Sequence, residues 1–535
     1  MQERGLTIQG LFLHGAAQYP RSRVTGFDGQ SVRHTDYAAT AERAGRLVNL
    51  LRRLGIAPGD RVGTFCWNTV EHLEAYFAVA SMGAVLHTNN VRLFPEQLSY
   101  IVNHAADRVL IVDGSLAGVL AKAAGQFRTV ERYLVIGEAA EALPGEMLDY
   151  EAELAREGAV VDWSEIDEHS AAGMCYTSGT TGNPKGVVYS HRSSFLHAMA
   201  IGGGGCLRLS DRDRVLMVPS MFHANSWGLP HAAWMAGADL IMPGRHLQAA
   251  PLCRLIREER PTLAAGVPTI WNDALRYADA NGGDFGSLRM ILSAGSAVPR
   301  SLIDGFRDRH GVHVVQAWGM TETSPLVTIA IPPKDCPAEA ESDYYAMAGR
   351  LIPGCELRIA TDDGSVAPRD GQTVGEVEVR GPWITASYYG DDSGEKFHDG
   401  WLRTGDVGTV DERGYLQIKD RTKDVIKSGG EWVSSVDLEN AIMGHPDVIE
   451  SAVVGVPDPR WDERPLACVV LRPGSSTTAA ELKAFLQDRV VKWWIPERWA
   501  FIDEIPKTSV GKFDKKVLRA RQAAGEISVV EAAGA

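Results

Sequence analysis

The sequence contains a run of small hydroxyl residues and glycines that is typical of a loop that binds phosphate. Thr177 to Gly186 reads TSGTTGNPKG and directly follows Gly173 to Tyr176, an apolar stretch that predicts a strand. Glycines allow the backbone to turn so that several N–H groups point at one anion, and the threonine hydroxyls add donors. Lys185 adds a cation. The GxxxxGK[ST] pattern does not fit here, and the alternative is a surface loop of small polar residues.

A second run combines an aromatic ring, a hydroxyl and a carboxylate. Gln316 to Pro325 reads QAWGMTETSP and follows another predicted strand. An aromatic ring beside a glycine, as at Trp318, can lie flat against a purine. Thr321 can donate a hydrogen bond to a phosphate oxygen, and Glu322 is a hard oxygen ligand suited to Mg²⁺. Taken alone, Glu322 would more often be a solvated carboxylate, because most acidic residues are exposed.

Two charged segments lie further along the chain. WLRTGD spans Trp401 to Asp406, and DRTKD spans Asp420 to Asp424. We expect Asp406 at the end of a strand, where a carboxylate can accept hydrogen bonds from the two hydroxyls of a ribose. Arg421 is placed to meet a ribose or a phosphate. The alternative is a charged turn between domains, and both interpretations can hold because a hinge is a turn.

These motifs arrive in the order found in the adenylate-forming superfamily, which the chain resembles from about Tyr37 to Arg519. The resemblance implies that the first loop clamps the β- and γ-phosphates of ATP. It also implies that Trp318 stacks on adenine, that Thr321 contacts the α-phosphate and that Asp406 binds the ribose. The residues assigned to ATP in this way are Thr177, Ser178, Gly179, Thr180, Thr181, Gly182, Lys185, Gln316, Trp318, Gly319, Asp406 and Arg421, with Thr177 and Glu322 as ligands of Mg²⁺.

The segment Pro506 to Lys512 (PKTSVGK) resembles the part of that superfamily that carries a catalytic lysine. A carboxylate is a poor acyl donor, but attack on the α-phosphorus of ATP converts it to a mixed anhydride with AMP as the leaving group. Two anions must meet in this step, so Mg²⁺ and a lysine are needed to stabilise the charge. The resemblance assigns this lysine as Lys512, with Thr321 and Glu322 as the other catalytic residues. A plain basic patch that includes Lys515 and Lys516 is the alternative.

The resemblance implies coenzyme A as the acyl acceptor. A thiol with a pKa of about 8.5 is a competent nucleophile near neutral pH, so no dedicated base is required. In this superfamily the small C-terminal domain rotates after adenylation, and Lys423 matches the hinge position. Gly429 and Gly430 would then lie along the CoA channel, and Trp432 matches the gate of the fatty-acid tunnel in long-chain synthetases.

The activated acid is expected to be hydrophobic. Met221 to Pro230 (MFHANSWGLP) resembles the mouth of the acyl pocket in the fatty-acyl branch, and His223 stands where domains that activate amino acids usually carry an aspartate. An amino acid is therefore not the expected substrate. Trp227, Trp234 and Trp271 offer apolar area for a tail, with ordinary core packing as an equal alternative. The predicted acyl pocket comprises His223, Asn225, Trp227, Gly295, Ser296 and Trp432.

The elements that must position these residues alternate between strands and helices. Arg108 to Gly114 and Gly311 to Gly319 are almost continuously apolar, which favours strands buried on both faces of parallel sheets flanked by helices. Tyr37 to Leu54 has a helical pattern, and the apolar run Ala75 to Leu86 predicts a buried helix. The fold class is therefore α/β.

The hydrophobic pattern of the chain changes after about residue 350, where strands with alternating polarity predict a small β-rich subdomain. We predict an N-terminal adenylation domain over residues 1–420, with its β-rich part at about 350–420. A hinge is predicted at 421–424 and a mobile α+β C-terminal domain with the catalytic lysine at 425–535.

The composition excludes several other classes of protein. A net charge of −14 argues against a general nucleic-acid binder. The seven cysteines form no CxxC pair, which favours reduced thiols over a disulfide framework or a zinc site. No apolar stretch of about 18 residues and no secretory signal occur, so we expect a cytoplasmic protein without a membrane-spanning segment. A homodimer is an option, because related long-chain synthetases form dimers.

Three alternatives stay open. The acyl group could pass to a carrier-protein thiol or an amine in place of CoA. The chain could be a luciferase-like oxygenase, or it could bind a nucleotide without catalysis.

Overall fold

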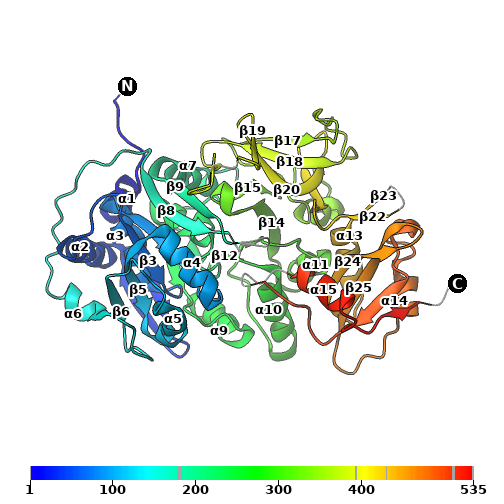
Figure 1. The fold of residues 1–535 in the computed structure, drawn as a ribbon, viewed down its shortest axis with the longest axis horizontal. Coiled ribbons are helices and arrows are strands. Elements are labelled where there is room, and N and C mark those ends of the chain that lie inside the picture. The colour runs from blue at the N-terminus through cyan, green and yellow to red at the C-terminus, as the bar shows by residue number, and fades with distance from the viewer. Residues whose placement is uncertain (1, 178–182, 392–393, 429–430, 509–512, 533–535) are drawn as a thin grey trace.

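The computed structural model describes residues 2–177, 183–391, 394–428, 431–508 and 513–532. In this part of the chain the strands form four sheets. The two largest sheets belong to a large N-terminal domain. The sheet formed by the last strands of the chain belongs to a smaller C-terminal domain at one end of the molecule (Figure 1).

The first large sheet carries the predicted phosphate loop at its edge. Its strands are parallel except for the last pair, in which β9 runs antiparallel to β8. In spatial order the strands are β7 (Glu146–Asp149), β6 (Arg132–Ile136), β5 (Asp107–Asp113), β3 (Arg61–Phe65), β4 (Val85–Thr88), β8 (Ala171–Tyr176) and β9 (Gly186–Ser190).

The second large sheet carries the other nucleotide motif. Its centre is parallel, and antiparallel pairs close it at both edges. In spatial order the strands are β16 (Arg350–Leu351), β15 (Leu326–Ile329), β14 (His313–Gly319), β13 (Met290–Ser293), β12 (Leu263–Gly266), β10 (Arg214–Leu216), β11 (Asp239–Met242), β1 (Arg23–Phe27) and β2 (Val32–Asp36).

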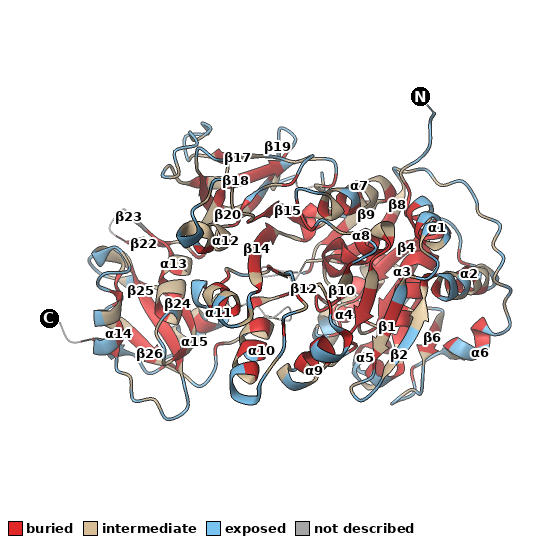
Figure 2. Ribbon diagram, turned by 180° about the vertical axis from the view of Figure 1, so that it is seen from behind, coloured by how far each residue is buried: buried red, intermediate tan, exposed pale blue. Residues whose placement is uncertain are grey.

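Helices cover both faces of the two sheets. The main core lies between the sheets and includes apolar residues of α1 (Ile8–Gln18), α2 (Tyr37–Arg53), α3 (Val70–Ser81), α7 (His191–Gly202) and α8 (Leu229–Ala236). A second core joins the outer face of the first sheet to α4 (Pro95–Ala105) and α5 (Ala117–Ala124). A third joins the second sheet to α9 (Ala249–Glu259), α10 (Pro268–Asn281) and α11 (Arg300–His310). Figure 2 shows the buried residues gathered on the strands and on the helix faces that meet them.

The β-rich subdomain and the C-terminal domain each have their own sheet. The subdomain contains β17 (Glu356–Ala360), β18 (Gly375–Arg380), β20 (Trp401–Val410), β19 (Phe397–His398) and β21 (Leu416–Arg421). The C-terminal sheet contains β22 (Ile426–Ser428), β23 (Glu431–Val433), β24 (Val448–Asp458), β25 (Asp462–Leu471), β26 (Arg498–Phe501) and β27 (Val530–Glu531). The helices α13 (Ser435–Met443), α14 (Ala479–Leu486) and α15 (Lys515–Ala523) accompany it, and α14 begins at a capping box formed by Thr478 and Glu481.

The predicted α/β class, with sheets flanked by helices, is confirmed. One expectation is wrong: Ala75 to Leu86 is not a single helix, because α3 ends at Ser81 and β4 begins at Val85. Gly83, with φ of 85°, makes the turn between them, and buried residues on both sides hide this break in the apolar pattern. All seven cysteines are free thiols. None of the helices in the described ranges is long and apolar enough to span a bilayer.

Candidate active site

The two ends of the predicted phosphate loop are held together by the strands that flank it. β8 and β9 pair so that Tyr176 lies opposite Gly186. Beyond this pair the Thr177 N–H donates to the Lys185 carbonyl at 2.9 Å, and the Lys185 N–H donates to the Thr177 hydroxyl at 3.1 Å. The predicted loop residues outside the described ranges are Ser178, Gly179, Thr180, Thr181 and Gly182. Their contact with phosphate stays a prediction.

The carboxylate predicted to hold Mg²⁺ is buried. A short 3₁₀ turn, η3 (Thr321–Thr323), follows β14. Thr321 and Glu322 are 8% and 5% exposed, so Glu322 is not the solvated surface carboxylate of the alternative interpretation. Its Oε1 accepts a hydrogen bond from the Tyr388 hydroxyl at 2.6 Å.

Two neighbours in the same motif fix the backbone around this turn. Oε1 of Gln316 accepts the Val298 N–H at 2.6 Å, which ties β14 to the loop that carries Gly295 and Ser296. At Gly319 an added Cβ would lie 1.9 Å from the Pro325 carbonyl oxygen, so a side chain does not fit there. Both residues shape the pocket, and their direct contact with ATP stays a prediction.

The predicted adenine and ribose residues contact each other. Nε1 of Trp318 donates to Oδ2 of Asp406 at 2.7 Å, and Nε of Arg421 lies 3.4 Å from Oδ1 of the same carboxylate. The expectation that Asp406 ends a strand is wrong, because β20 continues to Val410. Gly405, with φ of 76°, precedes a register shift in the ladder and marks an irregularity inside the strand.

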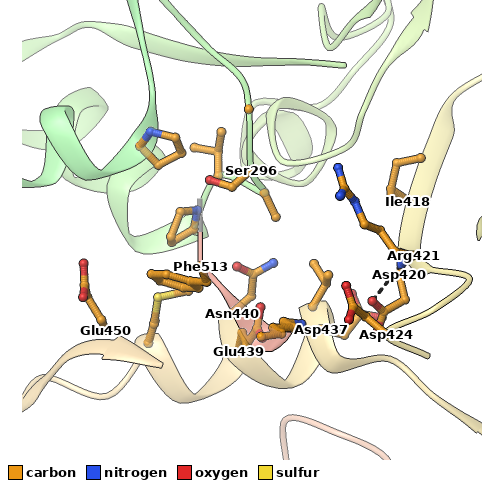
Figure 3. Close-up of a pocket in the computed structure, with 18 of the residues that line it drawn as sticks. Ser296, Ile418, Asp420, Arg421, Asp424, Asp437, Glu439, Asn440, Glu450 and Phe513 are labelled. Carbon is orange, nitrogen blue, oxygen red and sulfur yellow. Dashed lines mark hydrogen bonds and ion pairs between the residues drawn. The ribbon is translucent and has the colours of Figure 1, made fainter. Parts of the chain in front are cut away.

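A cavity of about 1760 Å³ separates the N-terminal domain from the C-terminal domain (Figure 3). This volume exceeds the roughly 300–1,000 Å³ of an ordinary small-ligand pocket, so it offers space for more than one ligand. Its N-terminal wall includes Gly295, Ser296, Gln316, Trp318, Gly319, Asp406 and Arg421. Its C-terminal wall includes Asp437, Glu439, Asn440, Glu450 and Phe513.

The motif at the mouth of the predicted acyl pocket has a left-handed backbone. Four consecutive residues other than glycine, Ala224 to Trp227, have φ between 42° and 60°. This conformation costs L-residues roughly 1–2 kcal/mol each. Two hydrogen bonds hold it: Ser226 Oγ donates to the Pro219 carbonyl at 2.6 Å, and Cys175 Sγ donates to Asn225 Oδ1 at 3.2 Å.

The structure brings only some of the predicted acyl-pocket residues to the cavity. Of the described members of that set, Gly295 and Ser296 line the cavity, whereas His223, Asn225 and Trp227 do not. Trp227 packs in the main core between the large sheets. Trp432 lies on β23 opposite Lys427, and its role as a gate stays a prediction.

For two other tryptophans the structure supports core packing. Trp234 is stacked on Tyr37 with ring centroids 3.8 Å apart, and its Nε1 donates to the Phe12 carbonyl at 3.0 Å. Trp271 is fully buried against Phe306.

Charged groups near the predicted hinge tie together segments on both sides of it. Lys423 lines the cavity at an exposed position, and partial desolvation there lowers its pKa. Asp420, which precedes the hinge, is 2% exposed. Its Oδ2 accepts the Ser435 N–H at 2.9 Å and the Ser435 hydroxyl at 2.5 Å. Asp424 forms an ion pair with Arg519 of α15.

Lys515 is part of a buried ion pair and not of an exposed basic patch. Its Nζ lies 2.7 Å from Glu439 Oε1, and both side chains are about 10% exposed or less. Burial opposes the charge of the ammonium, but the carboxylates of Glu439 and Asp420 raise the pKa of Lys515 overall. Three predicted residues of the C-terminal domain, Lys512, Gly429 and Gly430, lie outside the described residues.

Tyr388 and Asp391 contact predicted site residues, although no sequence motif points to either of them. Besides the bond from Tyr388 to Glu322, Asp391 Oδ2 lies 2.8 Å from Nζ of Lys185. These residues are separated in sequence from their partners by 66 and 206 positions, so no local pattern connects them.

The described residues are consistent with a nucleotide-bound Mg²⁺ at Glu322. Within these residues no group of three or more His, Cys, Asp or Glu side chains gathers into a metal site. Mg²⁺ that binds with a nucleotide needs only one or two carboxylates, because phosphates and waters complete its shell. A buried carboxylate held through one oxygen suits that requirement.

Models of known protein families match both the N-terminal and the C-terminal part of this chain. The chain matches the model of the AMP-binding enzyme over residues 12–389 and that of the AMP-binding enzyme C-terminal domain over residues 437–512. It is 44% identical to a 3-methylmercaptopropionyl-CoA ligase of Ruegeria pomeroyi, over 97% of this chain and 98% of the relative. It is 45% identical to a long-chain-fatty-acid–CoA ligase of Thermus thermophilus, over 97% and 96% of the two chains.

Solved structures share the whole fold. The anthranilate CoA ligase AuaEII in complex with anthranoyl-AMP is similar with a TM-score of 0.87 and 26% identity, over 97% of this chain and 98% of that chain. The amide bond synthetase McbA from Marinactinospora thermotolerans is similar with a TM-score of 0.82 and 25% identity, over 96% and 99%. The resemblance to the adenylate-forming superfamily is confirmed: this chain belongs to the AMP-binding enzyme family.

Proposed function

We propose that this protein is an ATP-dependent acid–thiol ligase that converts a hydrophobic carboxylic acid to its acyl-adenylate and then to its CoA thioester. The observation that carries the proposal is the contact of Trp318, Asp406 and Arg421 on one wall of the cavity between the domains. These side chains offer an aromatic face, an acceptor for ribose hydroxyls and a cation at one place. The relatives with 44% and 45% identity are both CoA ligases.

In the first half-reaction a carboxylate oxygen of the acid attacks the α-phosphorus of ATP, and pyrophosphate leaves. Asp406 accepts the ribose hydroxyls, Thr321 donates to the α-phosphate and Lys185 approaches the outer phosphates. Glu322 and Thr177 would hold Mg²⁺, which supplies positive charge to the phosphates when bound. Lys512 offsets the repulsion between the two anions, which are the carboxylate of the acid and the α-phosphate of ATP. A preorganised cation in a site that excludes water is worth more than one in solvent.

In the second half-reaction the sulfur of CoA attacks the acyl carbon, the bond to AMP breaks and a thioester forms. The thiol proton leaves to solvent, because no base is assigned to it. Lys423 is the proposed hinge that allows the C-terminal domain to turn between the two steps. Gly429 and Gly430 are proposed to lie along the path of the pantetheine arm, with Trp432 at the entrance to the acyl pocket.

The proposed acid has an apolar tail and no α-amino group. By resemblance, His223 stands where domains that activate amino acids usually carry an aspartate, which could pair with an ammonium. His223 does not line the cavity, whereas Ser296 and Gly295 line it beside the nucleotide residues. The relatives named above act on long-chain fatty acids and on 3-methylmercaptopropionate. A further relative, 39% identical over 97% of this chain and 96% of its own length, is a medium-chain-fatty-acid–CoA ligase of Ectopseudomonas oleovorans.

The test is product formation by the purified protein with ATP, Mg²⁺ and a panel of acids, each with and without CoA. The panel contains 3-methylthiopropionate, short, medium and long fatty acids, an aromatic acid and an amino acid. We expect release of pyrophosphate with the apolar acids and acyl-CoA only when CoA is present. Acyl transfer to an amine or a carrier protein, with none to CoA, would exclude the proposed acceptor. Light scattering of the same sample tests the proposed homodimer.

A further inference from the structure

The segment Thr385–Asp391 joins the two parts of the nucleotide site that are far apart in sequence. It follows β18 in the β-rich subdomain. The Thr385 N–H donates to the Glu322 carbonyl at 2.8 Å. Four residues later the Tyr389 N–H donates to the Gly186 carbonyl at 2.8 Å, at the end of the phosphate loop. The backbone of this segment therefore connects the second nucleotide motif to the first.

Between these two backbone contacts the Tyr388 side chain reaches the carboxylate itself. Its hydroxyl donates to Oε1 of Glu322 at 2.6 Å, and the residue is 6% exposed. Its ring packs with Cys175, Val187 and Tyr189 of β8 and β9.

The same ring meets the cation of the phosphate loop. Nζ of Lys185 lies 4.7 Å from the centre of the Tyr388 ring, within the range of a cation–π contact. Within the described residues Lys185 forms its ion pair with Asp391, at 2.8 Å, and not with Glu322. A direct pair between Lys185 and Glu322 would neutralise both groups before a ligand arrived. The tyrosine contacts each of them with a different part of its side chain.

We propose that Tyr388 is a positioning residue that orients the Glu322 carboxylate for the divalent cation of the nucleotide. The hydrogen bond fixes Oε1 and sets the direction of Oε2. Glu322 then offers the cation one oxygen in a defined direction, and its affinity depends on the tyrosine hydroxyl. Partners of metal ligands commonly contribute 10–100-fold to metal affinity. The inference rests on the proposed role of Glu322 in binding Mg²⁺.

The variant Tyr388→Phe tests the proposal, because it removes the hydroxyl and keeps the ring under Lys185. Calorimetry measures binding of ATP to the intact protein over a series of Mg²⁺ concentrations and, separately, binding of ATP in EDTA. We expect the Mg²⁺ concentration for half-maximal enhancement of ATP binding to rise about tenfold or more. Binding of metal-free ATP should change by less than twofold.

Tyr389→Phe is the matched control, because the neighbouring tyrosine loses the same hydroxyl but contacts the loop through its backbone N–H. It should leave the Mg²⁺ dependence unchanged. Tyr388→His retains a ring donor and should recover part of the Mg²⁺ affinity, and it serves as the second variant if Tyr388→Phe does not fold. Equal weakening of ATP binding with and without Mg²⁺ would show a structural role only and overturn the proposal. If the natural protein binds ATP without any dependence on Mg²⁺, the assigned role of Glu322 fails first.

Discussion

The two walls of the cavity between the domains hold their charged groups in different ways. On the N-terminal wall, Asp406 is contacted by the Trp318 indole and, at 3.4 Å, by the half-exposed Arg421 guanidinium. On the C-terminal wall, the Lys515 ammonium pairs with Glu439 and also donates to the Ser435 hydroxyl. The first wall presents polar groups that a ligand can take over, whereas the second wall satisfies its charges internally.

The two walls therefore separate charges that can serve binding from charges that hold the fold together. A partly exposed pair contributes roughly 0–1 kcal/mol, so Arg421 and Asp406 can exchange partners at little cost. A buried pair that loses one partner leaves an uncompensated charge at a cost of roughly 3–5 kcal/mol. Lys515 therefore holds the start of α15 against α13, and Lys512 precedes it by three residues. On the proposed function, the C-terminal wall supports the catalytic segment and the N-terminal wall supports the nucleotide.

The largest expected effect is on the stability of the C-terminal domain. Lys515→Met should lower the free energy of unfolding of the C-terminal domain by about 3–5 kcal/mol, because Glu439 would be left buried and unpaired. Denaturant titration followed by tryptophan fluorescence measures the loss. Lys516→Met, at an exposed position of the same helix, should change stability by about 0.5 kcal/mol or less. Equal effects of the two substitutions would contradict an architectural role for Lys515.

The next largest effect is expected on the rate of adenylation. Lys512→Ala should slow adenylation by about 10²–10³-fold, the scale of one lost preorganised donor. Pyrophosphate exchange measures this step. Thioester formation from a synthetic acyl-adenylate should be largely retained, because the role proposed for the lysine is in the first half-reaction. A similar loss in both steps would argue against rotation of the domain, and Lys516→Ala controls for a general loss of positive charge.

On the N-terminal wall a smaller effect is expected. Asp406→Asn keeps the size of the side chain but weakens its hydrogen bonds to a ribose, and hydrogen bonds to charged groups contribute roughly 1.5–3 kcal/mol. The KM for ATP should therefore rise about tenfold, with little change in the free energy of unfolding. Asp362→Asn, at an exposed turn, is the matched control. A large loss of stability with an unchanged KM for ATP would show that Asp406 stabilises the fold and does not bind the nucleotide.

The smallest effect concerns the contact across the hinge. Ser435→Ala removes the hydroxyl bond to Asp420 together with the contact from Lys515, and it retains the backbone bond to Asp420. A net hydrogen bond is worth about 0.5–1.5 kcal/mol, so the ratio of adenylation rate to thioester formation rate should shift about 2–10-fold. Single-turnover kinetics of the two steps measures this ratio. An unchanged ratio would mean that this contact persists in both half-reactions.

Much of the fold was accessible from the sequence because periodic patterns report on burial. The helical pattern from Tyr37 matches α2, and the apolar runs near Arg108 and Gly311 match β5 and β14. Thr321 and Glu322 were found through a motif of neighbouring residues, and the structure places both in a buried turn.

The rest depends on contacts between distant segments. Tyr388 meets Glu322 only because the β-rich subdomain packs on β9, and no local pattern encodes that contact. The expectation that Asp406 ends a strand rests on the resemblance and on the ability of a carboxylate there to accept from ribose hydroxyls, and not on a pairing pattern. The ladders on both sides of β20 continue past Asp406 with register shifts, which only the pairing with β18 and β21 reveals. Periodicity describes one element at a time, whereas the cavity walls are assembled from several.

The left-handed turn from Ala224 to Trp227 has a practical consequence for substitutions within it. Its shape is a property of four linked peptide units, held by Pro219 and Cys175 outside the turn. Exchanging one of its side chains for glycine would relieve local backbone cost and, at the same time, loosen the register of the other three. The shape of the turn should therefore be retained when the whole turn is transplanted with its two anchoring residues, and lost more readily when single positions are exchanged.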